Sequence, residues 1–389
     1  MELKKYKLGE ILDVTRGASL SGEFYAAEGE YVRLTCGNFD YQNNCFKENK
    51  AKDNLYYIGD FKPDFLMKEG DIITPLTEQA IGLLGSTAII PESGKYIQSQ
   101  DVAKIVCKEH LLDKDFAFYL ISSNLVKQQL SAAAQQTKIR HTSPDKIKDC
   151  IVWIPELEEQ KRIGKLLRTI DLKIELNRQL NHNLEAMAKQ LYDYWFVQFD
   201  FPDENGKPYK SSGGKMVWDK RLKREIPLLW KAKMVEEVAD VYNGATPSTV
   251  NELNYGGDIV WITPKDLSDQ KQKFVYQGER NISQVGYDSC STHLLPSNTI
   301  LMSSRAPIGL LAIAKTELCT NQGFKSFVSK SKNIATYLYY YLQYHITQIE
   351  QLGTGTTFKE VSREDILKFP MLKPSDNIRF MGRNCISTQ

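Results

Sequence analysis

The sequence predicts an α+β protein in which two homologous mixed α/β domains are joined by one long helix. Three observations predict this fold: the chain repeats itself, each copy alternates short apolar runs with turn residues, and a heptad pattern separates the copies. The chain has 389 residues, of which 42% are hydrophobic and 25% are charged. These are globular values, and the length suffices for two separate cores.

The internal repeat organises the whole chain. Residues 8–18 (LGEILDVTRGA) align with residues 235–245 (VEEVADVYNGA), an offset of 227 positions. The same offset holds at residues 81–84, and it shrinks toward the end of each copy, where Pro155 matches Pro374. An ordered series of matches over about 145 residues indicates a duplicated domain.

Each copy is predicted to contain short buried strands followed by one amphipathic helix. The apolar runs that predict the strands are bounded by Gly, Pro, Asn and Ser, and they cover residues 71–74, 87–90 and 103–106, then 258–262, 299–302 and 311–314. The helices are expected over 113–133 and over 333–353, the second with Asn333 as N-cap and Gly353 as C-cap. The tyrosines of residues 337–344 have a spacing that favours core packing over base stacking.

The segment from Pro155 to Val197 predicts one long helix, because after Pro155 it contains no further proline and only one glycine, Gly164. Apolar residues recur on a heptad, with Asn177 and Lys173 as interruptions, which is typical of a coiled-coil seam. The two series of the seam are Ile163, Ile170, Leu184 and Leu191, and Leu166, Leu180, Met187 and Tyr194. At 1.5 Å per residue the helix would be about 64 Å long. A helix that only packs on its own domain is less favoured, because such helices rarely exceed about 25 residues.

Charge and cysteine content give weaker indications. The net charge is only +2, but basic residues gather between Lys215 and Lys233. This stripe fits either a nucleic-acid contact or a solvated linker. The seven cysteines form an odd set without a C-x-x-C pair, which argues against a disulfide framework and against a zinc site.

The motifs of the common catalytic sites are missing. The sequence has no phosphate-binding loop, no G-x-G-x-x-G after a strand, no H-E-x-x-H and no G-x-S-x-G, and its five histidines are scattered. Asp203 and Glu204 could suggest a nuclease pair, but a solvated turn is the favoured interpretation. We therefore expect a non-catalytic chain with no metal and no cofactor of its own. No apolar run approaches the roughly 20 residues of a membrane span, so a cytoplasmic protein is expected.

Taken in order, the motifs resemble the specificity subunit of type I restriction-modification systems. The resemblance covers nearly the whole chain, and its motifs are specific through their order more than individually. The matching residues are Leu8-Gly9-Glu10-Ile11, Pro155 with Glu159-Gln160 and Ile163, Leu191-Tyr192 with Trp195-Phe196, residues 202–209 (PDENGKPY), Ile226-Pro227 with Trp230, residues 244–248 (GATPS), Ser303-Ser304-Arg305 with Ile308-Gly309, and Asn321-Gln322-Gly323-Phe324.

This resemblance implies that each repeated domain is a target-recognition domain that reads one half of a bipartite sequence in double-stranded DNA. Two methyltransferase (M) subunits would bind the same framework, and a restriction (R) subunit would join through them. Methylation and cleavage, with S-adenosylmethionine, ATP and magnesium, would belong to those partner chains. The implied boundaries are residues 1–154 and 227–373 for the domains, 155–198 for the spacer helix and 199–226 for the linker.

One departure from the family pattern concerns a second long helix, which in the family follows the second domain and lies antiparallel to the first. Here residues 374–389 are expected to be only a truncated start of it. The central helix would then present an unpaired apolar stripe. Three hypotheses follow: the stripe forms a homodimer, it binds a methyltransferase subunit, or the chain is a scaffold or decoy without productive recognition. The stripe consists of Ile163, Leu166, Ile170, Leu180, Leu184, Met187 and Leu191.

The resemblance also places candidate DNA-binding residues on loops. Arginine suits base edges and lysine suits phosphates, so we expect Arg140 and Arg305 to read bases, and Lys138 and Lys359 to contact the backbone. The full predicted set is Arg16, Lys138, Arg140, His141, Thr246, Ser248, Lys265, Arg305, Thr357 and Lys359.

Overall fold

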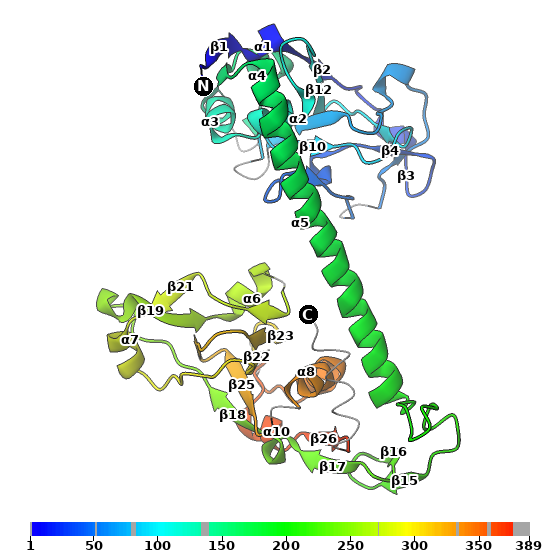
Figure 1. Ribbon diagram of the computed structural model, residues 1–389, viewed down its shortest axis with the longest axis vertical. Helices are drawn as coiled ribbons and strands as arrows, with labels where there is room; N and C mark the ends of the chain where they lie inside the picture. Colours follow the sequence, from blue (N-terminus) through cyan, green and yellow to red (C-terminus); the bar gives the residue numbers. More distant parts are fainter. Residues whose placement is uncertain are drawn as a thin grey trace. The chain divides into compact units, whose positions relative to one another are not determined.

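The computed structural model describes residues 2–50, 53–78, 83–133, 140–270, 272–331, 334–355 and 359–375. The chain forms two compact units, Met1–Asn177 and Arg178–Gln389. Helix α5 (Leu157–Tyr192) supplies residues to both of them (Figure 1). No helix of the described residues is long and apolar enough to cross a membrane.

The first unit is built on a four-stranded antiparallel sheet with the order β10-β8-β12-β2. Its strands are β10 (Ala88–Ile89), β8 (Ile72–Pro75), β12 (Val102–Cys107) and β2 (Leu12–Arg16). All four residues of the central strand β8 are buried, which explains its continuous apolar run. A second sheet has the order β11-β4-β7-β3, with β11 (Tyr96–Ile97), β4 (Tyr31–Arg33), β7 (Tyr56–Tyr57) and β3 (Tyr25–Ala26).

Shorter elements complete this unit. Strand β1 (Lys4–Lys7) pairs with β14 (Ile151–Ile154), so the two ends of the domain lie side by side. The remaining strands are β5 (Phe39–Asp40), β6 (Cys45–Phe46), β9 (Thr77–Glu78) and β13 (Arg140–His141), and the helices are α1 (Leu8–Ile11), α2 (Lys114–Ile121), α3 (Asn124–Ala133) and α4 (Pro144–Lys148).

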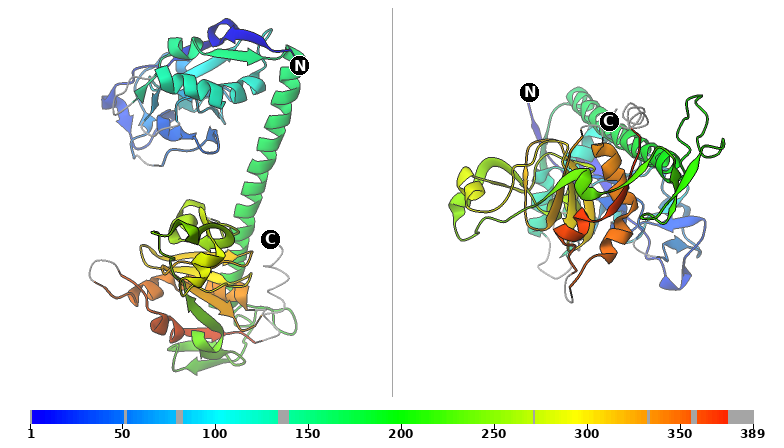
Figure 2. Two further views of the ribbon diagram at one scale, coloured as in Figure 1. Left: turned by 90° about the vertical axis from the view of Figure 1, so that its left-hand side faces the viewer. Right: turned by 90° about the horizontal axis from the view of Figure 1, so that it is seen from below.

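The second unit repeats this architecture, as Figures 1 and 2 show. Its main sheet has the order β18-β25-β22-β23-β20, and its small sheet the order β21-β19-β24. The strands are β18 (Ala239–Asn243), β25 (Phe324–Ser329), β22 (Ile300–Ser304), β23 (Ile308–Ala314), β20 (Phe274–Val275), β21 (Arg280–Ile282), β19 (Tyr255–Ile262) and β24 (Cys319–Thr320). The helices are α6 (Pro264–Gln270), α7 (Gln284–Asp288), α8 (Ala335–Tyr344), α9 (Ile346–Gln351) and α10 (Arg363–Leu367).

Backbone pairing confirms that the two domains are homologous. Strand β17 (Lys231–Met234) pairs with β26 (Pro370–Lys373) as β1 pairs with β14. The Leu8 N–H donates to the Cys150 carbonyl at 2.9 Å, and the Val235 N–H donates to the Phe369 carbonyl at 3.1 Å. In each small sheet one pair of strands is parallel, β11 with β4 and β24 with β19. The predicted fold class and the six predicted strands are therefore correct.

The two domain helices were predicted as single elements, and this is wrong in both cases. The helix expected over 113–133 is divided into α2 and α3, because the Ser122 hydroxyl bonds back to the Phe118 carbonyl and the Ser123 hydroxyl accepts from the Val126 N–H. The helix expected over 333–353 is divided into α8 and α9 at His345. Asn333 lies outside the described residues, and α9 ends at Gln351, with Leu352 and not Gly353 as its C-cap.

Helix α5 is anchored in the first unit by a buried glutamine. The Gln160 side chain is 1% exposed; it accepts a hydrogen bond from the Asp113 N–H at 3.0 Å and donates to the carbonyls of Leu111 and Pro155. Gly164 lies one turn further along, where a Cβ would be 2.6 Å from the Phe116 nitrogen. The single glycine of the helix is therefore a point of close packing against α2.

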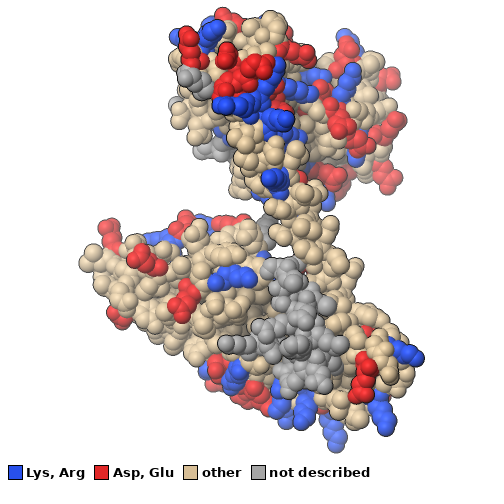
Figure 3. Space-filling view, viewed as in Figure 1, with Lys and Arg blue, Asp and Glu red and all other residues tan. Residues whose placement is uncertain are grey.

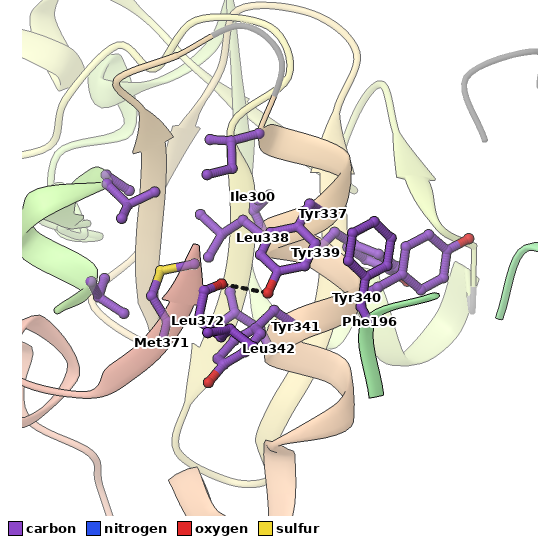
Figure 4. Packing of buried hydrophobic residues seen from close by; sticks show 14 of the residues in the cluster. Phe196, Ile300, Tyr337, Leu338, Tyr339, Tyr340, Tyr341, Leu342, Met371 and Leu372 are labelled. Carbon is purple, nitrogen blue, oxygen red and sulfur yellow. Dashed lines mark hydrogen bonds between the residues drawn. The ribbon is translucent and has the colours of Figure 1, made fainter. Parts of the chain in front are cut away.

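The other end of α5 is anchored in the second unit by aromatic packing, followed by a π-helical turn over Asp193–Val197. Tyr192 stacks on Tyr340. The Phe196 ring centroid lies 4.9 Å from that of Tyr337, and both residues are labelled in Figure 4. The tyrosines at 337, 339, 340 and 341 are at most 6% exposed, which confirms their predicted place in the core, whereas Tyr344 is half exposed.

A buried charge reinforces this anchor. The Lys273 ammonium lies 3.0 Å from Glu185 Oε2 and 2.7 Å from the Tyr340 hydroxyl, and that hydroxyl donates to Glu185 Oε1. Burial lowers the pKa of Lys273, although the ion pair with Glu185 opposes this effect. The Lys273 side chain is only 11% exposed, so its ammonium group has lost most of its hydration. The Glu185 carboxylate of α5 is the main group that compensates for this loss.

We predict that Glu185→Ala destabilises the second unit, because it leaves the Lys273 cation buried without its carboxylate. Glu185 is about a third exposed, so the expected cost is about 2 kcal/mol and not the full 3–5 kcal/mol of a buried pair. The unfolding transition of this unit should fall by roughly 4–8 °C in calorimetry. Glu158→Ala, which removes an exposed pair with Lys161 on the same helix, is the control and should change little. Equal shifts for the two variants would contradict the assignment.

Candidate nucleic-acid interface

A glycine follows the first strand of each main sheet, Gly17 after β2 and Gly244 after β18. At this glycine the loop comes very close to another backbone segment of the same domain. A Cβ on Gly244 would lie 2.2 Å from the carbonyl oxygens of Thr320 and Asn321, and one on Gly17 would lie 2.3 Å from the Gln98 carbonyl oxygen. The following residue then bonds to that same backbone, Ala245 to Thr320 and Ala18 to Gln98. The repeated glycine is therefore required for close approach, and it directs both loops alike.

Two predicted DNA-binding residues of the second domain follow this glycine. Thr246 is exposed, and its hydroxyl bonds to the Gln322 side-chain carbonyl. Ser248 is exposed as well, and its hydroxyl accepts weakly from the Val250 N–H at 3.4 Å. Gln322 belongs to one of the family motifs but was not predicted as a site residue; its contact with Thr246 places it at the same surface.

Lys265 lies at the start of α6 and pairs with Glu279 at 2.8 Å, each side chain being about two thirds exposed. This ion pair raises the pKa of Lys265. Asp266 fixes the surrounding loop, because its carboxylate accepts from Thr263 and from the Glu279 N–H at 2.7 Å. The first domain builds the same turn with Asn38, which accepts from the Thr35 N–H.

The two arginines expected to read bases both stand beside a glutamate. Arg305 follows β22, and its Nη1 lies 3.6 Å from Glu360 Oε2. Arg140 lies on β13, and its Nη1 lies 3.8 Å from Glu78 Oε2. Each arginine is more than a third exposed. Neither glutamate was predicted, because both partners are distant in the sequence and no spacing rule connects them.

The loops of the second domain meet around Gly323. The Ser304 N–H donates to the Gly323 carbonyl at 2.7 Å, and a Cβ on Gly323 would lie 2.9 Å from Pro264. Gln322, which contacts Thr246, immediately precedes this glycine. The structure thus brings together the loops that carry Thr246, Lys265 and Arg305.

The first domain has a comparable arrangement. Ser99 donates to the Leu34 carbonyl at 2.6 Å, the Cys36 thiol lies 2.8 Å from the Thr77 hydroxyl, and Thr77 pairs with the exposed His141. Arg16, at the end of β2, is fixed by donation from Nε to the Gln100 carbonyl at 2.8 Å. Lys359 of the second domain is exposed. Lys138 and Thr357, which were also predicted, lie outside the described residues.

Most of the basic stripe lies on a β-hairpin, β15 (Met216–Asp219) with β16 (Arg224–Pro227), at the end of the predicted linker, and Lys231 and Lys233 lie on β17. Lysines and arginines gather over this part of the second unit in Figure 3. Arg224 is partly used for structure, since it donates to the Val197 carbonyl and lies over the Phe199 ring. The stripe residues that stay exposed are Lys215, Lys220, Arg221, Lys223 and Lys231. This hairpin is therefore a cationic surface on a regular element.

Helix α5 carries an apolar stripe that the described residues leave uncovered. Leu166 is 62% exposed, Leu180 52% and Met187 63%, whereas Ile163, Leu184 and Leu191 are partly buried. Ile170, with 45% exposure, continues the stripe. From Leu172 to Asn183 every residue is exposed. The heptad seam predicted from the sequence is present, and within the described residues no second helix covers its middle part, from Leu172 to Asn183.

Comparison with known proteins adds a family match over most of the chain. The model of the type I restriction modification DNA specificity domain matches residues 1–186 and 227–378. The specificity subunit of the type I restriction enzyme HindI of Haemophilus influenzae is 24% identical, over 97% of this chain and 91% of its own length. That of MjaIX of Methanocaldococcus jannaschii is 37% identical, over 41% of this chain and 39% of the relative.

Among solved structures, the S subunit of a type I restriction-modification system from M. genitalium shares the fold. The TM-score is 0.61 at 13% sequence identity, and the alignment covers all of this chain and 89% of that one. The family match occurs twice, once in each of the two homologous domains. The chain therefore belongs to the type I restriction-modification DNA specificity family, and it is a specificity subunit.

Proposed function

We propose that each domain reads one half of a bipartite DNA target and that the chain performs no chemistry itself. The observation that carries this proposal is the duplication of one loop arrangement: in both domains a partly exposed arginine stands among loops that a close-packed glycine positions. The backbone around the two sites is alike, but the polar side chains differ. Two such sites with different side chains suit two different half-sites.

Within each half-site we propose a division of roles. Arg140 and Arg305 present guanidinium groups on paired backbone, which suits bidentate contact with guanine. Lys359 is exposed, and it would contact phosphate without reading sequence. Arg16, His141, Thr246, Ser248 and Lys265 would complete the interface, as would Lys138 and Thr357. The cationic hairpin β15–β16 offers further phosphate contacts.

We propose that the apolar stripe of α5 binds methyltransferase subunits, through which a restriction subunit joins. Leu166, Leu180 and Met187 are half to two thirds exposed in the chain alone, and apolar side chains in such a row are expected to be covered in a complex. Methyl transfer and cleavage, with their cofactors, would then lie on the partner chains, and work on cellular DNA would place the complex in the cytoplasm. Pairing of the stripe with a second copy of this chain is the competing possibility.

Arg305→Ala should relax specificity at one position of one half-site, at a cost of about 1–3 kcal/mol for the correct base. Lys359→Ala should weaken binding to all sequences alike and reduce the slope of log K against log salt by about one. Target duplexes selected from a random pool, titrated at two salt concentrations against the chain with its methyltransferase subunit, would measure both effects. Two variants with identical behaviour would contradict the division of roles.

Leu180→Glu together with Met187→Glu should release the methyltransferase subunit, because each apolar side chain buried in a complex contributes about 1.5–3 kcal/mol. Both residues are more than half exposed, so the chain itself should remain folded. His182→Glu, on the opposite face of the helix, is the matched control. The test is co-purification combined with light scattering. Retention of the methyltransferase, with a wild-type dimer that becomes a monomer in the double variant, would show that a second copy occupies the stripe.

A further inference from the structure

An arginine-glutamate pair lies at the same site of both domains, but with opposite polarity. Strands β8 and β22 correspond, and the chain that follows them carries Glu78 in the first domain and Arg305 in the second. The segment that precedes α4 carries Arg140, and the segment that precedes α10 carries Glu360. The acidic and the basic residue have exchanged segments between the two domains. The pair was therefore not simply copied, with each residue in its place, when the domain was duplicated. A functional requirement for one arginine and one glutamate at this site explains better why both domains have the pair.

In each pair the carboxylate is fixed and the arginine is not. Glu78 is 2% exposed, and its Oε1 accepts from the Leu83 N–H at 2.9 Å. Glu360 Oε1 accepts from the Lys325 ammonium at 3.2 Å and from the Ser304 hydroxyl at 3.3 Å. Lys325 itself is only 5% exposed, so it holds this carboxylate from the buried side.

Among the described residues, the side chains of the two arginines are held only by charge. Their distances to the glutamates, 3.6 and 3.8 Å, exceed the roughly 2.7–3.2 Å of a hydrogen bond. Within the described part of the chain neither guanidinium group has another ion-pair partner. The five N–H donors of each therefore remain available to an incoming group, and the side chain can move without breaking a strong bond.

We propose that Glu78 and Glu360 are specificity-determining residues that restrain Arg140 and Arg305 until the correct base edge is presented. This inference rests on the proposed function of the two arginines. A fixed carboxylate weakens the attraction of its arginine for the phosphates of non-target DNA. A correctly placed guanine edge offers two directed acceptors that can replace the loose ion pair, and a non-target site lacks this edge. The glutamates thus reduce binding to non-target DNA more than binding to target.

The test compares Glu360→Gln and Glu78→Gln in the full chain, with a random-sequence duplex as the probe. Each variant should bind this probe about three- to tenfold more tightly, and its salt slope should steepen by about 0.9, the value for one more neutralised phosphate. The preference for the selected target over the random duplex should fall. Glu237→Gln and Glu92→Gln, which remove lysine-paired carboxylates elsewhere in the second and first domains, control for the change of net charge.

A double variant separates restraint of the arginine from mere charge removal. In an Arg305→Ala background, Glu360→Gln should no longer change the affinity for the random duplex, because its effect acts through that arginine. Unchanged or weaker non-target binding in both glutamine variants, or a gain that persists without Arg305, would overturn the inference while leaving the proposed function intact. A wild-type chain that binds neither target nor random duplex, alone or with its methyltransferase subunit, would overturn the proposed function and the inference with it.

Discussion

The attachment of helix α5 at both of its ends is the constraint on which the rest of the structure depends. Near its start, the buried side-chain amide of Gln160 makes three hydrogen bonds to backbone groups. These bonds take the place of the hydrogen bonds to water that the amide loses on folding. Near its end, Tyr192 and Phe196 join the tyrosines of α8, and Glu185 holds the buried Lys273. A buried polar group that is fully paired allows few alternative packings, so each domain is fixed to its own segment of the helix.

Comparison of the two domains distinguishes the residues that position the loop backbone from the exposed side chains that the loops carry. Gly17 and Gly244 meet the same steric limit, and Asn38 and Asp266 close the same turn, because these features carry the backbone. The exposed residues beside them are different in the two domains. A shared support with independent surface residues allows the two halves to acquire different specificities without a change in the fold.

Much of this fold could be predicted from the sequence, because a repeat, an apolar run and a heptad are local patterns. The six strands and the long helix follow from them, and so do the buried tyrosines of α8. The breaks between α2 and α3 and between α8 and α9 could not be predicted, because Ser122 and His345 compete for helix carbonyls only through bonds that the folded chain makes. Glu78 and Glu360 were missed for a related reason: pairing across distant strands decides which arginine each of them faces.

Whether this chain supplies the address for catalysts on other polypeptides can be measured in cells. Sequencing of the methylome, with and without the chain, tests this claim most directly. The account predicts that methylation of one bipartite motif disappears when the chain is removed, while the methyltransferase subunit is still present. An unchanged methylation pattern, or methyl transfer by the purified chain alone, would contradict it.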